Sequence, residues 1–322
     1  MTGQASDSTT GQASDSTTGH ATDSTTGAVT VRVPAKVNVQ LAVGAARPDG
    51  FHDLANVFLA VSLYDEVTAT PAAGTKVTCE GPDADQVPLD RTNLAARAAG
   101  ILAERAGLTP DVHLHIAKNI PVAGGMAGGS ADGAAALVAC DALWGLDTPM
   151  AELLDICAEL GSDVPFSLVG GAALGTGRGE ILTPVPAGAF HWVFAVADGG
   201  LSTPAVFREF DRLAAGHEIP APQASPALLA ALASGDPDAL APTLVNDLQP
   251  AALSLRPQLA SVLAAGTAAG ALAALVSGSG PTTAFLARDR AAAAGVAAVL
   301  DASGLCRATR VASSPAPGAT LL

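Results

Sequence analysis

A glycine-rich run at residues 121–133 constrains the fold more than any other part of the sequence. It reads PVAGGMAGGSADG and has four glycines within the six positions before Ser130. Polar and apolar residues alternate over 111–116, which predicts a strand ahead of the run. Apolar residues at helical spacing follow it as far as Trp144. The run therefore joins a strand to the start of a helix, with Ser130 at the junction.

This run suits the binding of phosphate groups. Glycine lets the backbone take positive φ and approach a ligand closely. A helix N-terminus also presents unpaired N–H groups and the positive end of its dipole to an anion. A polyphosphate is the expected ligand, although the glycines alone leave a simple tight turn open. No lysine follows Gly129 and no GxGxxG fingerprint is present, which excludes the two best-known phosphate loops.

The charge of the chain argues against two classes of partner, nucleic acids and anionic membranes. Its 322 residues include 30 acidic and 16 basic side chains, for a net charge of −14. Nucleic acids and anionic membranes require clustered Lys and Arg, so neither is expected. A polyphosphate must then be bound by backbone dipoles, a few local cations and Mg²⁺, whose ligands the sequence does not identify. The oligomeric state is equally open.

Neither a signal peptide nor a membrane span is expected, so we predict a cytoplasmic protein. The longest weakly polar run, residues 263–276, is too short to cross a bilayer. Four scattered cysteines form no CxxC pair, as expected for reduced thiols. Residues 1–27 repeat an eight-residue unit without a recurring apolar position, which predicts a disordered tail.

The remainder predicts two α+β domains in series, an N-terminal domain at residues 28–180 and a C-terminal domain at 181–322. Glycines between 170 and 179 indicate hairpin turns and the junction. The strands predicted from apolar alternation cover residues 28–41, 54–64, 66–70, 112–116, 192–197, 272–276 and 283–286. The predicted helices cover residues 92–106, 130–144, 149–160 and 290–303, with a long Ala-rich helix after residue 250. The first of them is capped by Thr92 or Asn93 and ends at Gly107.

Some polar residues of the N-terminal half are candidates for a site. Lys36 and Asn38 share one face of a strand whose other face is apolar. A Pro-Asp-Gly turn then presents Phe51 and His52 together. A surface lysine, and a core Phe beside a surface His, are the structural alternatives. Asp163, between a helix and a proline, fits ordinary turn chemistry.

Three motifs resemble those of the GHMP small-molecule kinases: AKVN at 35–38, the glycine run at 121–130, and VSGSG at 276–280. The resemblance covers residues 29–315. The segments RPDGFH, GSDVPF and GRGEIL narrow it to members whose alcohol substrate is linked to cytidine diphosphate, in the non-mevalonate isoprenoid pathway. It implies an N-terminal domain like ribosomal protein S5 domain 2, a ferredoxin-like C-terminal domain, and ATP and substrate meeting between them.

The resemblance also implies roles for individual residues. Asp163 would be the catalytic base, and Lys36 would hold this carboxylate and the substrate hydroxyl in place. The cytosine would lie against His52, with Phe207 on its other face. The ATP-binding residues it implies are Pro121, Val122, Ala123, Gly124, Gly125, Met126, Ala127, Gly128, Gly129, Ser130 and Ala131, with Asn93 and Lys118 at the adenosine end. The substrate-binding residues it implies are Asn38, Phe51, His52, Thr203, Phe207, Ser277, Gly278 and Ser279.

The glycine run departs from the family pattern at three positions. Ala123 and Ala127 stand where many relatives have glycine, so their φ must be negative or the backbone must tolerate a methyl group. Asp132 replaces a frequent asparagine, and we expect it to face away from the nucleotide. Phe51 replaces a frequent tyrosine but keeps the ring.

Two other functions remain as alternatives to this kinase. A non-catalytic nucleotide sensor could lack the base or the lysine, whereas both Lys36 and Asp163 are present. A sister kinase could act on mevalonate, phosphomevalonate or homoserine. The pairing of Phe51 with His52, which suits a nucleobase, argues against that. His113 and His115 share a strand face, where a solvated surface is favoured over a metal site.

Overall fold

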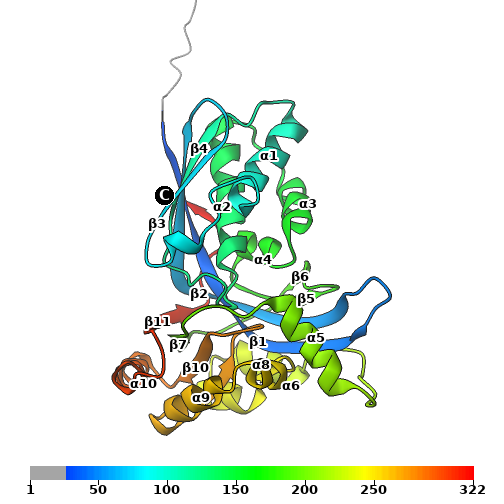
Figure 1. The fold of residues 1–322 in the computed structure, drawn as a ribbon, viewed down its shortest axis with the longest axis vertical. Coiled ribbons are helices and arrows are strands. Elements are labelled where there is room, and N and C mark those ends of the chain that lie inside the picture. Colours follow the sequence, from blue (N-terminus) through cyan, green and yellow to red (C-terminus); the bar gives the residue numbers. More distant parts are fainter. Residues whose placement is uncertain (1–26) are drawn as a thin grey trace, which may run out of the picture.

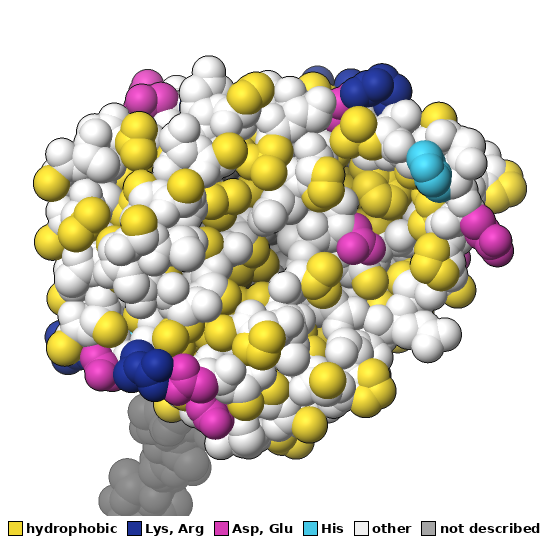
Figure 2. Space-filling view, turned by 90° about the horizontal axis from the view of Figure 1, so that it is seen from below, with side chains coloured by type: hydrophobic (Ala, Val, Ile, Leu, Met, Phe, Trp, Pro, Cys, Tyr) yellow, Lys and Arg dark blue, Asp and Glu magenta, His cyan; other side chains and the backbone are white. Residues whose placement is uncertain are grey.

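The computed structural model describes residues 27–322. The tail predicted for residues 1–27 lies outside this range, apart from Gly27. Figure 1 shows two parts: a sheet with helices on one side above, and a second sheet with its own helices below. No helix of the described chain is long and apolar enough to cross a membrane. Around the face drawn in Figure 2, basic side chains lie at separate places and form no patch.

The first sheet has eight strands within residues 27–322, and its main path runs β12-β1-β2-β4-β3. The strands are β1 (Val29–Ala46), β2 (His52–Pro71), β3 (Lys76–Glu80), β4 (Val112–Ala117), β5 (Ala172–Thr176), β6 (Ile181–Pro184), β8 (Val245–Asn246) and β12 (Thr320–Leu321). Three register shifts interrupt the β1–β2 pairing. Such shifts bend strands, and this long hairpin reaches from the first sheet down to the second domain (Figure 1).

Four helices cover one face of this sheet (Figure 1). They are α1 (Leu94–Ala106), α2 (Gly128–Trp144), α3 (Met150–Leu160) and α4 (Val164–Val169). The predicted ends of α1 are confirmed: the Asn93 side chain accepts a hydrogen bond from the Ala95 N–H, and Gly107 ends the helix with φ 68°. The turn predicted at Asp163 is confirmed, and it leads directly into α4, where Pro165 suits a first helical turn.

The second sheet is antiparallel with the order β11-β7-β10-β9. Its strands are β7 (Phe190–Val196), β9 (Ala273–Val276), β10 (Thr283–Ala287) and β11 (Ala308–Ser314). Numbered within this sheet the order is 4-1-3-2, which is the predicted ferredoxin-like arrangement. The helices of this half are α5 (Thr203–Ala214), α6 (Pro226–Ser234), α7 (Pro237–Leu240), α8 (Gln249–Leu255), α9 (Gln258–Ala268) and α10 (Arg290–Ser303), and the short 3₁₀ helices of the chain are η1 (Ala84–Gln86) and η2 (Ala241–Thr243).

The single long helix predicted after residue 250 is wrong. Two helices occupy that stretch, with Arg256 and Pro257 between α8 and α9. Proline has no N–H and clashes with the preceding turn, so it ends the first helix and begins the second. The strands predicted at 54–64 and 66–70 are likewise one continuous strand, β2.

Strand pairing places the domain junction later than expected. β6 pairs with β5, so the expected division between residues 180 and 181 falls inside a hairpin of the first sheet. Strands β8 and β12, from the second half of the chain, also return to pair with β1. We therefore propose a junction just after Pro184, with these two late strands completing the first domain.

A buried cluster of three charged residues supports the start of α2. The Lys118 ammonium contacts the carboxylate of Asp65 and lies 2.9 Å from Asp132 Oδ2. Asp65 also accepts hydrogen bonds from the backbone N–H groups of Asn119 and Ile120. All three charged residues are at most 2% exposed. The strand β2, the end of β4 and the helix α2 are thereby joined beneath the glycine run.

Asp132 should make the stability of the protein depend on pH. Burial, opposed by Lys118, raises its pKa from 3.8 to about 7, and its Oδ1 atom has no hydrogen-bond partner. Between these two values the folded chain binds a proton that the unfolded chain does not, so this group lowers the unfolding free energy as pH rises. Asp132→Asn removes this titration. In urea unfolding, the stability of the variant relative to wild type should therefore increase from pH 4 to 7 and then level off. Parallel pH curves would contradict this assignment.

Alanine substitutions at two glycines in helix interiors should change the unfolding free energy in opposite directions. A Cβ at Gly266 of α9 would lie 2.1 Å from the ring of Phe285 on β10, whereas a Cβ at Gly295 of α10 meets no atom within 4 Å. Gly266→Ala should lower the unfolding free energy by about 1–3 kcal/mol through overpacking. Gly295→Ala should raise it by about 0.5–1 kcal/mol through helix propensity. Equal effects on urea unfolding would show that Phe285 moves aside freely.

Candidate active site

A cleft of about 690 Å³ is lined by residues from both domains. The first domain contributes β1, β2, the glycine run, the start of α4 and the β5–β6 turn. The second domain contributes α5 and the turn between β9 and β10. The predicted site residues that line the cleft are Lys36, Asn38, Phe51, His52, Ala123, Gly124, Gly125, Ala127, Gly128, Gly129, Ser130, Asp163, Thr203, Phe207, Gly278 and Ser279.

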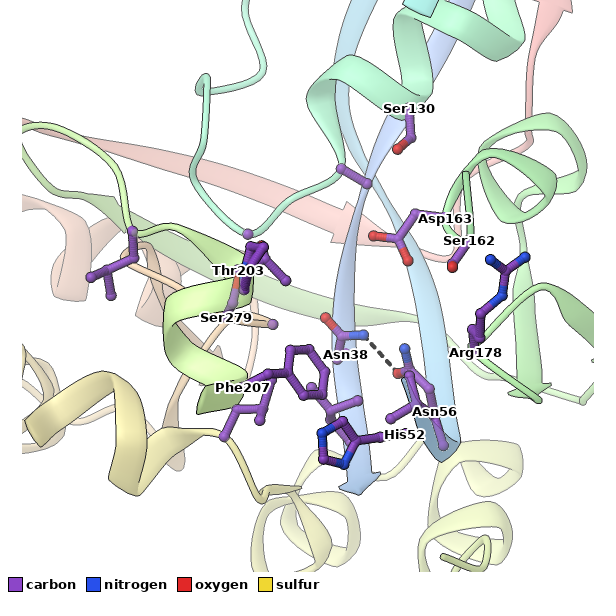
Figure 3. A pocket seen from close by; sticks show the side chains of 18 of the residues that line it. Asn38, His52, Asn56, Ser130, Ser162, Asp163, Arg178, Thr203, Phe207 and Ser279 are labelled. Carbon is purple, nitrogen blue, oxygen red and sulfur yellow. Dashed lines mark hydrogen bonds between the residues drawn. The ribbon is translucent and has the colours of Figure 1, made fainter. Parts of the chain in front are cut away.

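Lys36 lies at the centre of the site, and its side chain is only 5% exposed. Its ammonium donates hydrogen bonds to Asn38 Oδ1 at 2.7 Å and to the Gly125 carbonyl at 3.0 Å. Asn38 in turn donates to Asn56 Oδ1 at 2.6 Å, the bond dashed in Figure 3. The face of β1 that carries Lys36 and Asn38 is therefore buried in the cleft wall, and the surface-lysine alternative does not apply.

Asp163 lies above Asn38 in Figure 3, beside Ser162 and at the start of α4. Its Oδ2 atom is 3.6 Å from Lys36 Nζ, and its side chain is 33% exposed. Within residues 27–322 its carboxylate accepts no hydrogen bond. One wall of the cleft thus offers a carboxylate that is held near a buried cation and is free to accept a proton from a ligand.

The glycine run forms a tight loop before α2. The helix begins at Gly128, two residues earlier than expected. Ala123 and Ala127 have φ values of 52° and 61°. The backbone therefore tolerates a methyl group in the left-handed region, at roughly 1–2 kcal/mol per residue. The loop leaves the N-terminus of α2 facing the cleft, where the Ser130 side chain also lies (Figure 3).

The two glycine turns of the chain contact each other behind Lys36. Gly125 has φ 74°, and a Cβ there would lie 2.1 Å from the Ser277 carbonyl. The Ser277 hydroxyl donates to the Gly125 carbonyl at 3.1 Å. A Cβ at Gly278 would lie 3.2 Å from Lys36 Nζ and from Asn38 Oδ1. Only glycine permits this close approach of the two domains.

Several residues that the resemblance assigned to ligands support the loop instead of lining the cleft. Asn93 caps α1 and donates to the Pro88 carbonyl, and Lys118 is held between two carboxylates. Met126 is fully buried and Ser277 holds Gly125. The predicted site residues outside the cleft lining are Pro121, Val122, Met126, Ala131, Asn93, Lys118 and Ser277.

The aromatic end of the cleft differs from the expected arrangement. His52 is 6% exposed, and its Nδ1 donates to the Gly44 carbonyl at 2.8 Å. Its ring stacks directly on Phe207, with centroids 5.0 Å apart and an interplanar angle of 30°. No slot for a base exists between these two rings in this structure. Phe51 is half exposed at the cleft edge.

Sequence reasoning missed a group of polar residues in the cleft. They are Asn56, Ser162, Arg178, Arg208 and Asp211. Asn56 could have been found as the polar position within the apolar stretch of β2. Ser162 and Arg178 lie in the segments that carried the family resemblance. Arg208 and Asp211 lie on the same helix as Phe207, and no local signal distinguishes them from a solvated helix face.

His113 and His115, the pair considered as metal ligands, have hydrogen-bond partners within the sheet. Both rings form hydrogen bonds with the Thr78 hydroxyl on the neighbouring strand. Within residues 27–322 no group of three or more His, Cys, Asp or Glu side chains is arranged to hold a metal ion.

Comparison with known proteins agrees with this geometry. Residues 93–171 match the GHMP kinases N terminal domain, and residues 228–304 match the GHMP kinases C terminal domain. The chain is 75% identical to 4-diphosphocytidyl-2-C-methyl-D-erythritol kinase of Streptomyces avermitilis over 91% of its own length and 99% of the relative.

Solved structures show the same fold. A crystal structure of 4-(cytidine 5'-diphospho)-2C-methyl-D-erythritol kinase matches with a TM-score of 0.72 and 33% identity, over 89% of this chain and 99% of that one. A homoserine kinase from Cytophaga hutchinsonii matches with a TM-score of 0.70 over 92% and 97% of the two chains, but its 21% identity supports the fold alone. The chain therefore belongs to the 4-diphosphocytidyl-2-C-methyl-D-erythritol kinases of the GHMP kinase family.

Proposed function

We propose that this protein transfers the γ-phosphoryl group of ATP to the 2-hydroxyl of 4-diphosphocytidyl-2-C-methyl-D-erythritol, a step of the non-mevalonate isoprenoid pathway. The relatives' names supply the substrate. The observation that carries the chemistry is the pair of Lys36 and Asp163, 3.6 Å apart in one cleft with the N-terminus of α2. The four cysteines of the protein are free, which fits a cytoplasmic enzyme because thiols stay reduced in that compartment.

The reaction needs alignment and charge stabilisation more than covalent help. The N–H groups at the start of α2 face the triphosphate and stabilise charge on its oxygens. The substrate oxygen attacks the γ-phosphorus, the bond to the β–γ bridging oxygen breaks, and ADP leaves. Asp163 takes the hydroxyl proton as the new bond forms. Lys36, fixed by Asn38 and Gly125, holds the hydroxyl and the carboxylate in position.

Mg²⁺ fits the donors of this cleft. The ion prefers hard oxygen ligands and keeps several waters when it binds together with phosphates. The Ser130 hydroxyl, at the start of α2 in the cleft lining, would contribute one ligand, with phosphate oxygens and water as the others. When bound, Mg²⁺ neutralises charge on the β- and γ-phosphates.

The cytidine is assigned to the aromatic end of the cleft. Phe51 and Phe207 offer ring faces for stacking, and the edge of His52 offers a polar nitrogen. Because His52 already stacks on Phe207, the base cannot enter between them unless α5 shifts. We therefore assign stacking to the outward faces of Phe51 and Phe207 and hydrogen bonding to His52.

A substrate panel tests this function. Coupled ADP release should be measured with ATP and 4-diphosphocytidyl-2-C-methyl-D-erythritol, mevalonate, phosphomevalonate or homoserine as acceptor. We expect turnover with the cytidylyl substrate alone. Turnover with another alcohol would indicate a sister kinase. ATP binding without any turnover would favour a nucleotide sensor.

Asp163→Asn should test the proposed base. The variant keeps the size and polarity of the side chain but cannot take the proton, so kcat should fall by roughly 10²–10⁴-fold. The Kd for ATP, measured by calorimetry, should change less than about twofold. Asp155→Asn, at an exposed position of α3, serves as the matched control and should keep wild-type kinetics. A fully active Asp163→Asn enzyme would exclude this residue as the base.

A further inference from the structure

The proposed substrate carries a diphosphate for which the assigned residues provide no cation. This group lies between the cytosine and the methylerythritol, so it must cross the cleft between the aromatic end and Lys36. The Lys36 ammonium already has two hydrogen-bond acceptors and the Asp163 carboxylate around it. His52 directs Nδ1 to the Gly44 carbonyl. In a chain of net charge −14, a diphosphate requires another partner.

Arg178 has the position that this partner needs. It lies in the turn between β5 and β6 and lines the cleft. Figure 3 shows its side chain beside Ser162, on the wall opposite Phe207 and Thr203. Its Cζ atom lies 5.2 Å from the centroid of the Phe51 ring. The guanidinium thus lies between the ring proposed to stack on the base and the wall that carries Asp163.

The guanidinium is held on one edge only. The Glu180 carboxylate accepts a hydrogen bond from Arg178 Nε at 3.3 Å and another from the Arg178 backbone N–H at 2.7 Å. Within residues 27–322, the two terminal nitrogens of this guanidinium have no hydrogen-bond or ion-pair partner. A guanidinium with a free pair of terminal N–H groups matches phosphate oxygens in a bidentate manner.

We propose that Arg178 binds the diphosphate of the acceptor substrate and so selects nucleotide-linked alcohols over free alcohols. This inference rests on the proposed function, because it assumes the cytidylyl substrate. Arg208 on α5 also lines the cleft, but it is exposed. Arg178 is already oriented by Glu180 and Phe51, so it loses less rotamer freedom on binding.

The test compares ligands that differ only in their phosphates. Binding of CDP and of cytidine is measured by calorimetry for wild type, Arg178→Met and Arg178→Lys, alongside KM for the acceptor and for ATP. Arg178→Met should weaken CDP binding and raise the acceptor KM about ten- to a hundredfold, as expected for lost charged hydrogen bonds. Cytidine affinity and the ATP KM should change less than about twofold. Arg178→Lys should recover part of the loss.

Matched controls separate this role from its alternatives. Arg212→Met removes an equal charge from α5 at a position outside the cleft lining and should leave both affinities unchanged. Equal weakening of CDP and cytidine in Arg178→Met would mean that Arg178 acts through the Phe51 ring. A CDP-specific loss in Arg208→Met and not in Arg178→Met would assign the diphosphate to α5. Either result overturns the proposal.

The outcome is independent of whether the kinase assignment holds. CDP and cytidine binding need no turnover, so they report on Arg178 even if wild type phosphorylates no tested acceptor. Failure of wild type to phosphorylate the cytidylyl substrate would reject the proposed function. Unchanged CDP affinity in Arg178→Met, with an active wild type, would reject only the role of Arg178.

Discussion

The buried ammonium of Lys36 is the interaction on which the arrangement of the site depends. An amine removed from water is costly unless several oxygens compensate it. Here the oxygens come from three segments: Asn38 on β1, Gly125 in the glycine run and Asp163 at the start of α4. Satisfying one cation therefore fixes the phosphate loop and the proposed base relative to each other.

The cleft binds polyanions although the chain is acidic, and the placement of its charges explains how. Lys118 lies just beneath the phosphate loop, but Asp65 and Asp132 neutralise it, so it adds little positive potential. The backbone amides of the loop, together with the Mg²⁺ that we propose, are left to stabilise the triphosphate. At the other end of the cleft, Arg178 provides a cation whose terminal nitrogens are free. The two ends of the cleft thus stabilise negative charge with different groups, backbone amides at one end and a guanidinium at the other. This difference helps direct each phosphate-bearing ligand to its own end.

Local signals explain what could be predicted from the sequence, and distant contacts explain what could not. The cap at Asn93, the stop at Gly107 and the alternation in β4 depend on neighbouring residues. The pairing of Lys36 with Asp163 spans 127 positions, so only the family resemblance pointed to it. Strands β8 and β12 have two residues each, too few to show the alternation of polar and apolar residues that predicts a strand. The partners of Lys118 likewise come from β2 and α2, so its burial between two carboxylates could not be read from its neighbours in the sequence.

The contact between His52 and Phe207 bears on how the substrate base is selected. Each ring already stacks on the other, so a base on the outward face of Phe207 gains a ring contact that is much the same for every nucleobase. Stacking then contributes little discrimination, and the polar edges must provide it. The Gly44 carbonyl can only accept a hydrogen bond, so His52 carries a hydrogen on Nδ1, and its Nε2 lies 3.5 Å from Asp211 Oδ1. The Asp211 carboxylate, an acceptor in the cleft lining, would pair with the amino group of cytosine and leave the carbonyl of uracil unpaired, a mismatch that disfavours the wrong base far more than a change in ring contact would.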